Sequence, residues 1–85
     1  MGETQLDVRV LSPWKIIFEG KAKSVILPGE SGVFEVLAFH KPILSRLLTG
    51  ILYVDESKIP IRRGIVKCYL NEVVVIVEEM GEEFS

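Results

Sequence analysis

His40 is the only histidine in the chain, and histidine is the side chain best suited to acid–base chemistry near neutral pH. A Ser-His-Asp arrangement would need a serine nucleophile and a carboxylate to orient the ring. The candidates are Ser12, Ser31 and Ser45 with Asp7 or Asp55. None of these serines lies in the Gly-x-Ser-x-Gly turn that presents a nucleophile. We therefore predict no catalytic residue, and interpret His40 either as a turn histidine whose ring hydrogen-bonds the backbone or as a partner contact.

The segment 27–32, Leu-Pro-Gly-Glu-Ser-Gly, has the glycine content of a phosphate-binding loop. It lacks the Gly-Lys-Ser/Thr ending, and no helix follows whose amide dipoles could hold a phosphate. We interpret it as a loop between strands in which each glycine serves backbone geometry. Such a loop on a rigid sheet remains suited to surface recognition.

Cys68 is the only cysteine, so neither an intramolecular disulfide nor a multi-cysteine metal site can form. Its neighbours in residues 65–70 are strand-like, which favours a small buried hydrophobe over a reactive thiol. We predict no metal and no cofactor. The chain carries 10 Lys and Arg against 12 Asp and Glu, a net charge of -2, which disfavours nucleic acid and anionic lipid as partners.

Two further features could belong to a binding surface. Arg62 and Arg63 form the one adjacent basic pair, with Lys58 and Lys67 nearby, and a solvated face is the simpler interpretation. Trp14 follows Ser-Pro at the start of a strand, where a large ring serves either as a lid over the core or as an interface anchor.

These side chains must be positioned by strands, because the apolar residues alternate or run in short β-branched blocks separated by turn residues. Leu6, Val8 and Val10 alternate with charged residues, and Gly20 is expected to end the second strand. Residues 43–48 could be a helical turn or an extended segment, and the following Gly50 favours the extended form. The strands expected are 6–10, 14–18, 22–27, 33–37, 51–54, 59–62, 65–70 and 73–77.

Three places along these strands carry special signals. Pro42 predicts a corner after His40, and Pro60 predicts an edge position in the strand that follows the loop 55–58. Residues 71 and 72 predict a two-residue hairpin turn. The run 73–77 shows no alternation, so both of its faces should be covered, either within the fold or by a partner protein.

With 85 residues the chain is one domain, and its 48% hydrophobic and 26% charged residues fit a folded globular protein. About eight to ten short strands joined by hairpins indicate an all-β fold with mainly antiparallel pairing, a β-sandwich or a flattened barrel. We expect the domain to span residues 1–80 and an acidic C-terminal tail to span 81–85. No segment has the length of a signal-peptide core or of a membrane span.

The series in residues 25–50 carries a family resemblance. Its Leu-Pro-Gly turn, Gly-Val-Phe strand start and His-Lys-Pro-Ile-Leu corner resemble the N-terminal β-sandwich domain of the epsilon subunit of F-type ATP synthases. The resemblance extends from Leu6 to about Glu79, through the opening LDVRVLSP and the closing GIVKCYLNEVVVIVEE. The chain departs from the family pattern at four positions. Glu35, Phe39 and Arg63 stand where the family commonly has glycine, and Ala38 stands where it commonly has proline.

The resemblance implies a non-catalytic rotor subunit of the central stalk of an ion-translocating ATP synthase. Such a subunit binds the gamma subunit and the membrane rotor (c) ring within a hetero-oligomer, and helps to couple ion flow to ATP synthesis. It implies a peripheral location on the cytoplasmic face of the inner (plasma) membrane, without direct insertion. The C-terminal helical hairpin that commonly follows in the family is not expected within these 85 residues.

The resemblance also implies contact residues. Two loops would meet the polar loops of the rotor ring: Glu30, Ser31, Gly32 and Val33 in the first, and His40, Lys41 and Pro42 in the second. The surface near Ser12, Trp14 and Ser45 would lie against gamma. The alternative function is a stand-alone small β-barrel ligand-binding module, which would require a pocket with polar groups converging near His40.

Overall fold

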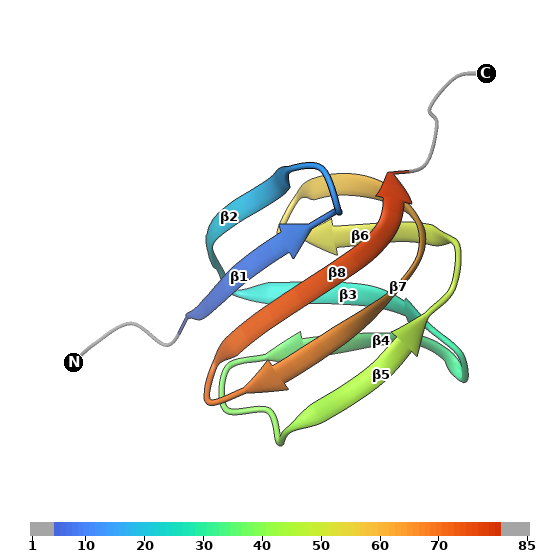
Figure 1. The fold of residues 1–85 in the computed structure, drawn as a ribbon. Coiled ribbons are helices and arrows are strands. Elements are labelled where there is room, and N and C mark those ends of the chain that lie inside the picture. The colour runs from blue at the N-terminus through green and yellow to red at the C-terminus, as the bar shows by residue number, and fades with distance from the viewer. Residues whose placement is uncertain (1–4, 81–85) are drawn as a thin grey trace.

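The computed structural model describes residues 5–80, with the side chains of 79 and 80 left aside; the acidic tail expected at 81–85 lies outside the described residues. The described chain is all-β, which confirms the predicted fold class (Figure 1). Its eight strands are β1 (Leu6–Leu11), β2 (Ile16–Ala22), β3 (Ser24–Gly29), β4 (Gly32–Leu37), β5 (Ile43–Leu47), β6 (Gly50–Val54), β7 (Ser57–Tyr69) and β8 (Glu72–Met80). Among the described residues there is no helix with the length and apolarity needed to cross a bilayer.

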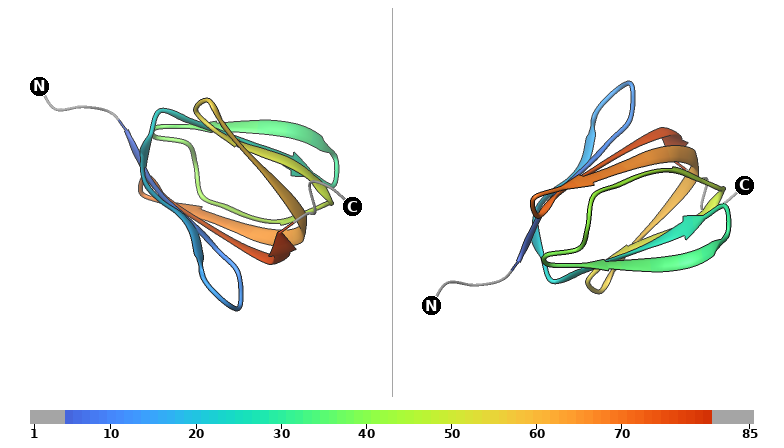
Figure 2. Two further views of the ribbon diagram at one scale, coloured as in Figure 1. Left: turned by 90° about the horizontal axis from the view of Figure 1, so that it is seen from above. Right: turned by 90° about the horizontal axis from the view of Figure 1, so that it is seen from below.

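The strands form one continuous sheet that folds over into two layers (Figure 2). The first layer has the order β2-β1-β8-β7-β5, and the second contains β4, β3, β6 and the beginning of β7. Pairing is antiparallel throughout, as expected, except that β1 and β8 run parallel. The first and last strands of the domain therefore lie side by side in the middle of the first layer.

A bent hairpin connects the two layers. Strand β5 pairs with β7 from Ile43–Cys68 to Leu47–Gly64. The same register continues where β6 pairs with β7, from Gly50–Ile61 onward. The break after Leu47 lies opposite Arg62 and Arg63, and Arg63 has a left-handed φ of 52°. The hairpin turns a corner there. The two strands predicted at 59–62 and 65–70 are in fact one long strand, because the basic pair marks a bend and not a loop.

The space between the layers is filled by inward-facing apolar side chains. Leu6, Val8 and Val10 are buried as their alternation predicts, and Val73, Val75 and Val77 of the adjacent strand β8 lie beside them on the inner side of the first layer. Burying each such side chain contributes roughly 1.5–3 kcal/mol. Among the side chains described, those of residues 5–78, no polar or charged one is buried. The sandwich is therefore held together by apolar packing and by its backbone ladders.

Several boundaries differ from the predicted ones. Gly20 lies inside β2 instead of ending it, since an extended backbone there pairs with Val8. The turn after β6 is only Asp55–Glu56, and the Asp55 carboxylate accepts the backbone N–H groups of Lys23 and Ser24 at 3.0 and 3.1 Å. The last hairpin turns at Leu70 and Asn71, both with positive φ, 50° and 64°, one residue earlier than predicted. That geometry matches the turn type that fits strand twist.

Pro60 pairs with Ile51 of β6 on one side, and over the described residues the pairing of β7 with β8 begins at Ile61. The edge position predicted for Pro60 stays a prediction. Residues 43–48 are extended over β5, which confirms the preference drawn from Gly50.

Candidate functional site

The outer surface of the first layer carries an apolar stripe that we call the first face. Cross-strand pairing aligns Leu11, Ile76, Ile65 and Arg46 in one row across β1, β8, β7 and β5. The exposed fractions are 53% for Ile76, 47% for Ile65 and 77% for the neighbouring Leu44. Only one side of the run 73–77 is therefore covered within the fold, since Val74 is half-buried and Ile76 is exposed. The first face comprises Leu11, Leu44, Arg46, Ile65 and Ile76.

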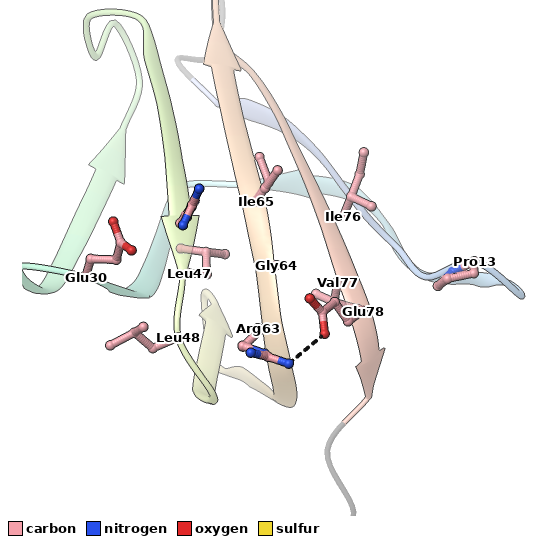
Figure 3. Close-up of a pocket in the computed structure, with 11 residues that line it drawn as sticks. Pro13, Glu30, Leu47, Leu48, Arg63, Gly64, Ile65, Ile76, Val77 and Glu78 are labelled. Carbon is pink, nitrogen blue, oxygen red and sulfur yellow. Dashed lines mark ion pairs between the residues drawn. The ribbon is translucent and has the colours of Figure 1, made fainter.

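A cleft of about 580 Å³ lies on the first face (Figure 3). Gly64 forms part of its floor, where β7 approaches β8 so closely that an added Cβ would stand 2.5 Å from the Ile76 carbonyl oxygen. Arg63 and Glu78 flank the cleft and pair at 3.4 Å between Nη2 and Oε1. Both partners are exposed, so this ion pair adds little stability. The lining residues are Pro13, Glu30, Arg46, Leu47, Leu48, Arg63, Gly64, Ile65, Ile76, Val77 and Glu78.

The turn that contains Ser12 and Trp14 stands at the edge of this face. The Ser12 hydroxyl accepts the backbone N–H groups of Trp14 and Lys15 at 3.3 and 3.2 Å, and Ser12 N–H donates to the Lys15 carbonyl at 2.9 Å. This closed turn lies beyond the end of the sheet and leaves Trp14 85% exposed. The interpretation of Trp14 as a core lid is wrong, and the interface interpretation stays a prediction.

Ser45 lies on β5 with its side chain on the half-buried side of the strand. Its hydroxyl donates to the Arg46 carbonyl at 3.2 Å. The residues on either side, Leu44 and Arg46, are exposed and alternate with it. Of the residues around the predicted gamma contact, Leu44 and Arg46 therefore present their side chains on the outer surface, whereas Ser45 does not.

The loop of Glu30 and Ser31 is a tight turn between β3 and β4. Gly29 pairs with Gly32, whose φ of 126° suits glycine alone, and Glu30 reaches the cleft of the first face. Val33, the next residue, is 73% exposed. A Cβ on Gly29 would stand 2.6 Å from the Phe34 ring, so this turn is fixed by close packing as well as by its backbone.

His40 sits in the corner predicted from Pro42. Its ring Nδ1 donates to the Lys41 carbonyl at 2.8 Å, which confirms the interpretation of a turn histidine bonded to backbone. The preceding Phe39 has a left-handed φ of 67° and is 77% exposed, and its N–H donates to the Asn71 side-chain oxygen at 2.6 Å. These residues line a hollow of about 310 Å³ together with Pro42, Tyr69 and Leu70.

His40 Nδ1 and Asn71 Oδ1, two polar atoms of residues that line this hollow, already form hydrogen bonds with backbone groups, so they are not available to a ligand. The two turns that form it are the connections after β4 and β7, brought together at one end of the sandwich (Figure 1). The alternative of a ligand-binding module with His40 as the central polar group gains no support from this arrangement.

The structure separates the two loops that were predicted to contact the rotor ring. Gly32 begins β4 beside Gly29, whereas Leu37 ends it beside Ser24, so the loops at 30–31 and 38–42 leave opposite ends of the strand (Figure 1). Glu30 joins the cleft that also includes Pro13. His40, Lys41 and Pro42 lie at the other end. One flat partner surface could touch both loops only by following the length of β4.

The second layer also has an outer surface, which we call the second face. Pairing aligns Glu35, Ile26, Tyr53 and Lys58 in a row across β4, β3, β6 and β7. Beside this row lie further apolar pairs, Pro28 with Val33 and Ile51 with Pro60. The second face comprises Ile26, Pro28, Val33, Glu35, Ile51, Tyr53, Lys58 and Pro60.

Cys68 is buried on the inner side of β7, as predicted, between Ile43 and Val73. Burial raises the pKa of its thiol above the ordinary value of 9.0, because desolvation disfavours the thiolate. In the part of the chain whose side chains the structure describes, residues 5–78, no group of three or more His, Cys, Asp or Glu is arranged to hold a metal ion.

Sequence reasoning missed most of the first face. Ile76 was visible as part of an apolar run with no alternation, but Ile65, Leu44 and Arg46 come onto the same face only through the register of β5, β7 and β8. The residues at the far end, Phe39, Tyr69 and Leu70, were likewise assigned no joint surface. Their exposure, from 55% to 77%, shows that both turns present apolar side chains to solvent.

An exposed apolar stripe beside a shaped cleft on one sheet of a β-sandwich is typical of surfaces that bind protein partners. Residues 5–83 match the sequence model of the family described as ATP synthase, Delta/Epsilon chain, beta-sandwich domain. The chain belongs to this family. The identification made from residues 25–50 and the flanking strands is thereby confirmed.

Individual relatives agree. The chain is 38% identical over 76 residues to the ATP synthase epsilon chain of the Cyanophora paradoxa cyanelle, covering 85% of this chain and 58% of that one. It is 34% identical over 80 residues to the ATP synthase epsilon chain of Sulfurimonas denitrificans, covering 88% of this chain and 62% of that one. The chain thus spans about three-fifths of the length of these relatives.

Solved structures show the same fold. A chain in the cryo-EM structure of the Euglena gracilis mitochondrial ATP synthase OSCP/F1/c-ring superposes with a TM-score of 0.82 at 21% identity, covering 98% of this chain and 57% of that one. A chain in the Tetrahymena thermophila mitochondrial ATP synthase central stalk/c-ring gives a TM-score of 0.75 at 12% identity, covering 100% and 77%. At these identities the likeness establishes the fold.

Proposed function

We propose that this chain is the β-sandwich part of a non-catalytic rotor subunit in the central stalk of an F-type ATP synthase. In this role it binds the gamma subunit and the rotor ring, and transmits rotation between ion flow and ATP synthesis. Its place is peripheral, on the cytoplasmic face of the inner (plasma) membrane. The family match over residues 5–83 carries the proposal, supported by the neighbours found in ATP synthase stalk and ring assemblies.

The first face is our candidate for the gamma contact. Ile65 and Ile76 are exposed and pair with each other, Leu44 is exposed on the adjacent strand β5, and Arg46 has no ion pair with the side chains described for residues 5–78. Apolar anchors surrounded by polar groups are the usual anatomy of a protein interface. Ser12 and Trp14, predicted to face gamma, lie in the turn at the edge of this surface and fit the same proposal as peripheral contacts. For Ser45, also predicted to face gamma, the exposed neighbours Leu44 and Arg46 would make the contact.

The rotor ring would meet the turn that includes Glu30, Ser31, Gly32 and Val33. The close packing of Gly29 on Phe34 keeps this turn in one shape, which suits a contact that must carry load. His40, Lys41 and Pro42 stand at the other end of β4, so we assign them a separate contact, with an adjoining part of the stalk.

The test is binding of purified gamma subunit to the chain and to two matched variants. Ile76→Asp and Ile51→Asp each put a carboxylate at an exposed isoleucine on a strand, one on the first face and one on the second. Losing an apolar anchor and burying a charge typically costs more than 2 kcal/mol at an interface. We expect Ile76→Asp to weaken gamma binding at least thirtyfold and Ile51→Asp to leave it within threefold.

Both variants must retain the far-ultraviolet circular dichroism and the unfolding midpoint of the parent chain for the comparison to count. Failure of the parent chain to bind gamma at low salt would overturn the stalk proposal. Binding that is lost in Ile51→Asp and kept in Ile76→Asp would keep the subunit assignment and overturn the choice of face.

A further inference from the structure

The second face has a charge order that is complementary to itself. Its central row reads Glu35, Ile26, Tyr53, Lys58, with an acid at one edge, a base at the other and two half-buried apolar side chains between them. Ile26 pairs with both Glu35 and Tyr53, and Tyr53 pairs with Lys58, so the order is fixed by strand pairing and not by loop positions. A surface of this kind can match a second copy of itself.

The symmetry of such a match is specific. If two copies stack face to face about a two-fold axis parallel to the strands, the row of one copy runs in reverse over the row of the other. Glu35 then lies over Lys58 and Lys58 over Glu35, while Ile26 and Tyr53 exchange places at the centre. A two-fold interface requires this kind of self-complementary patch. Stacked sheets pack about 10 Å apart, a distance that these side chains span.

The charges at the two edges are available for this contact. Lys58 makes no ion pair with the side chains described for residues 5–78, and Glu35 accepts one hydrogen bond, from the Ser24 hydroxyl at 2.6 Å, which leaves its second oxygen open. Around the row, Val33 and Ile51 are 73% and 41% exposed, so apolar area adjoins the charged edges. The first face lacks this symmetry, since its row from Leu11 to Arg46 carries a charge at one end only.

We propose that free copies of this chain associate in pairs through the second face, with reciprocal Glu35–Lys58 contacts. This goes beyond the stalk function, which uses the first face. The paired form covers Val33, so it excludes the contact proposed between the Glu30–Val33 turn and the rotor ring. Pairing is therefore a property of the chain outside the assembled complex.

The size of the face sets the expected strength. Four strands with about five residues each give a plane of roughly 300–400 Å² per copy from standard strand spacing and rise. Stable interfaces bury more than about 1,000 Å² in total, so this pairing is weak. We expect a dissociation constant of about 100 µM, measurable by sedimentation between about 10 µM and 1 mM.

The experiment is sedimentation equilibrium on the chain and a set of charge variants. The parent should move from 9.6 kDa toward twice that mass with rising concentration. Glu35→Lys and Lys58→Glu each place like charges together at two symmetric positions, and each should weaken pairing at least tenfold. The double variant Glu35→Lys with Lys58→Glu restores opposite charges and should return to within threefold of the parent.

Lys67→Glu is the matched control, because Lys67 is an exposed lysine of the same strand on the other layer. It should leave pairing unchanged, as should Ile76→Asp, whereas Ile51→Asp should abolish it. A chain that stays monomeric to 1 mM overturns the proposal. So does a double variant that fails to recover, or pairing that is sensitive to Ile76→Asp. Gamma binding is read separately, so either proposal can fail without the other.

Discussion

The two outer faces of the sandwich differ in how their apolar residues are arranged. On the first face, Ile76 and Ile65 lie side by side above a cleft with Arg46 at one end. On the second face, apolar residues lie between an acid and a base at opposite edges. The first is asymmetric and shaped, which suits a different protein. The second carries opposite charges at its two edges and is complementary to itself, which suits another copy.

The comparison also explains how a small domain can expose so much apolar surface. The described core contains only apolar side chains, and the layers are joined by the bent hairpin of β5, β6 and β7. Both faces can therefore vary without disturbing the packing between the layers. Substitutions on either face should change binding, and substitutions in the frame should change stability.

The largest expected effect comes from a substitution that deforms the first face from below. Gly64→Ala brings a methyl group to 2.5 Å from the Ile76 carbonyl oxygen and 3.0 Å from Val77 Cα, so β7 and β8 must move apart. Overpacking of this kind costs about 2–3 kcal/mol. Urea unfolding should show this loss, and gamma binding should weaken because the cleft loses its floor.

Gly20→Ala is the control for Gly64→Ala. Its added methyl group would meet only the Phe18 ring, at 3.6 Å, which is ordinary contact. The free energy of unfolding should stay the same or rise by about 0.5 kcal/mol, since alanine restricts the unfolded chain. Equal losses in both variants would show that the close approach of β7 and β8 is not what Gly64 provides.

A smaller effect of opposite sign is expected where the chain crosses from β4 of the second layer to β5 of the first. Phe39 holds a left-handed φ of 67° with its ring 77% exposed, a conformation that costs a non-glycine residue about 1 kcal/mol or more. Phe39→Gly should raise the free energy of unfolding by about 0.5–1 kcal/mol, measured by urea titration.

Leu37→Gly tests whether the gain at Phe39 comes from backbone conformation. Leu37 is also exposed, at 50%, but it lies in β4 with an ordinary strand backbone. Glycine there should destabilise the domain by roughly 0.5–1 kcal/mol. If both variants lost stability alike, the strain attributed to Phe39 would be absent.

The smallest expected effect concerns Cys68, which is buried in the core between the two layers. Burial raises the pKa of the Cys68 thiol above 9.0, so the folded chain keeps its proton at a pH where the unfolded chain loses it. The stability associated with the neutral thiol is present below pH 9.0 and is lost as the pH rises toward the folded pKa. Thermal unfolding midpoints should therefore fall more steeply above about pH 9 in the parent than in Cys68→Val. Parallel curves would contradict this account.

Local sequence pattern predicted the parts of the fold that depend on neighbouring residues. The alternation of Leu6, Val8 and Val10 identified the buried side of β1, and Pro42 and His40 identified the corner with its backbone hydrogen bond. The interpretation of Trp14 as a lid over the core failed, because the residues next to it in the sequence do not show whether its turn projects beyond the sheet. The pattern also divided β7 at the arginine pair, where the chain bends without leaving the ladder.

The candidate site was less predictable because it depends on strand order and register. Residues 30–33 and 40–42 are close in sequence, yet β4 carries them to opposite ends of the molecule. Conversely, Leu44, Ile65 and Ile76 are far apart in sequence and share one outer surface only because β5, β7 and β8 are adjacent. The alternation of apolar and polar residues within one strand does not predict which strand will lie beside it.

The central claim is that the first face, and not the second, receives the gamma subunit. Backbone amide chemical shifts of the isotopically labelled chain, followed during titration with gamma, test it residue by residue. The largest shifts should cluster at Leu44, Ile65 and Ile76, with Ile26 and Tyr53 unchanged. Large shifts at Ile26 and Tyr53 with an unperturbed first face would contradict the claim.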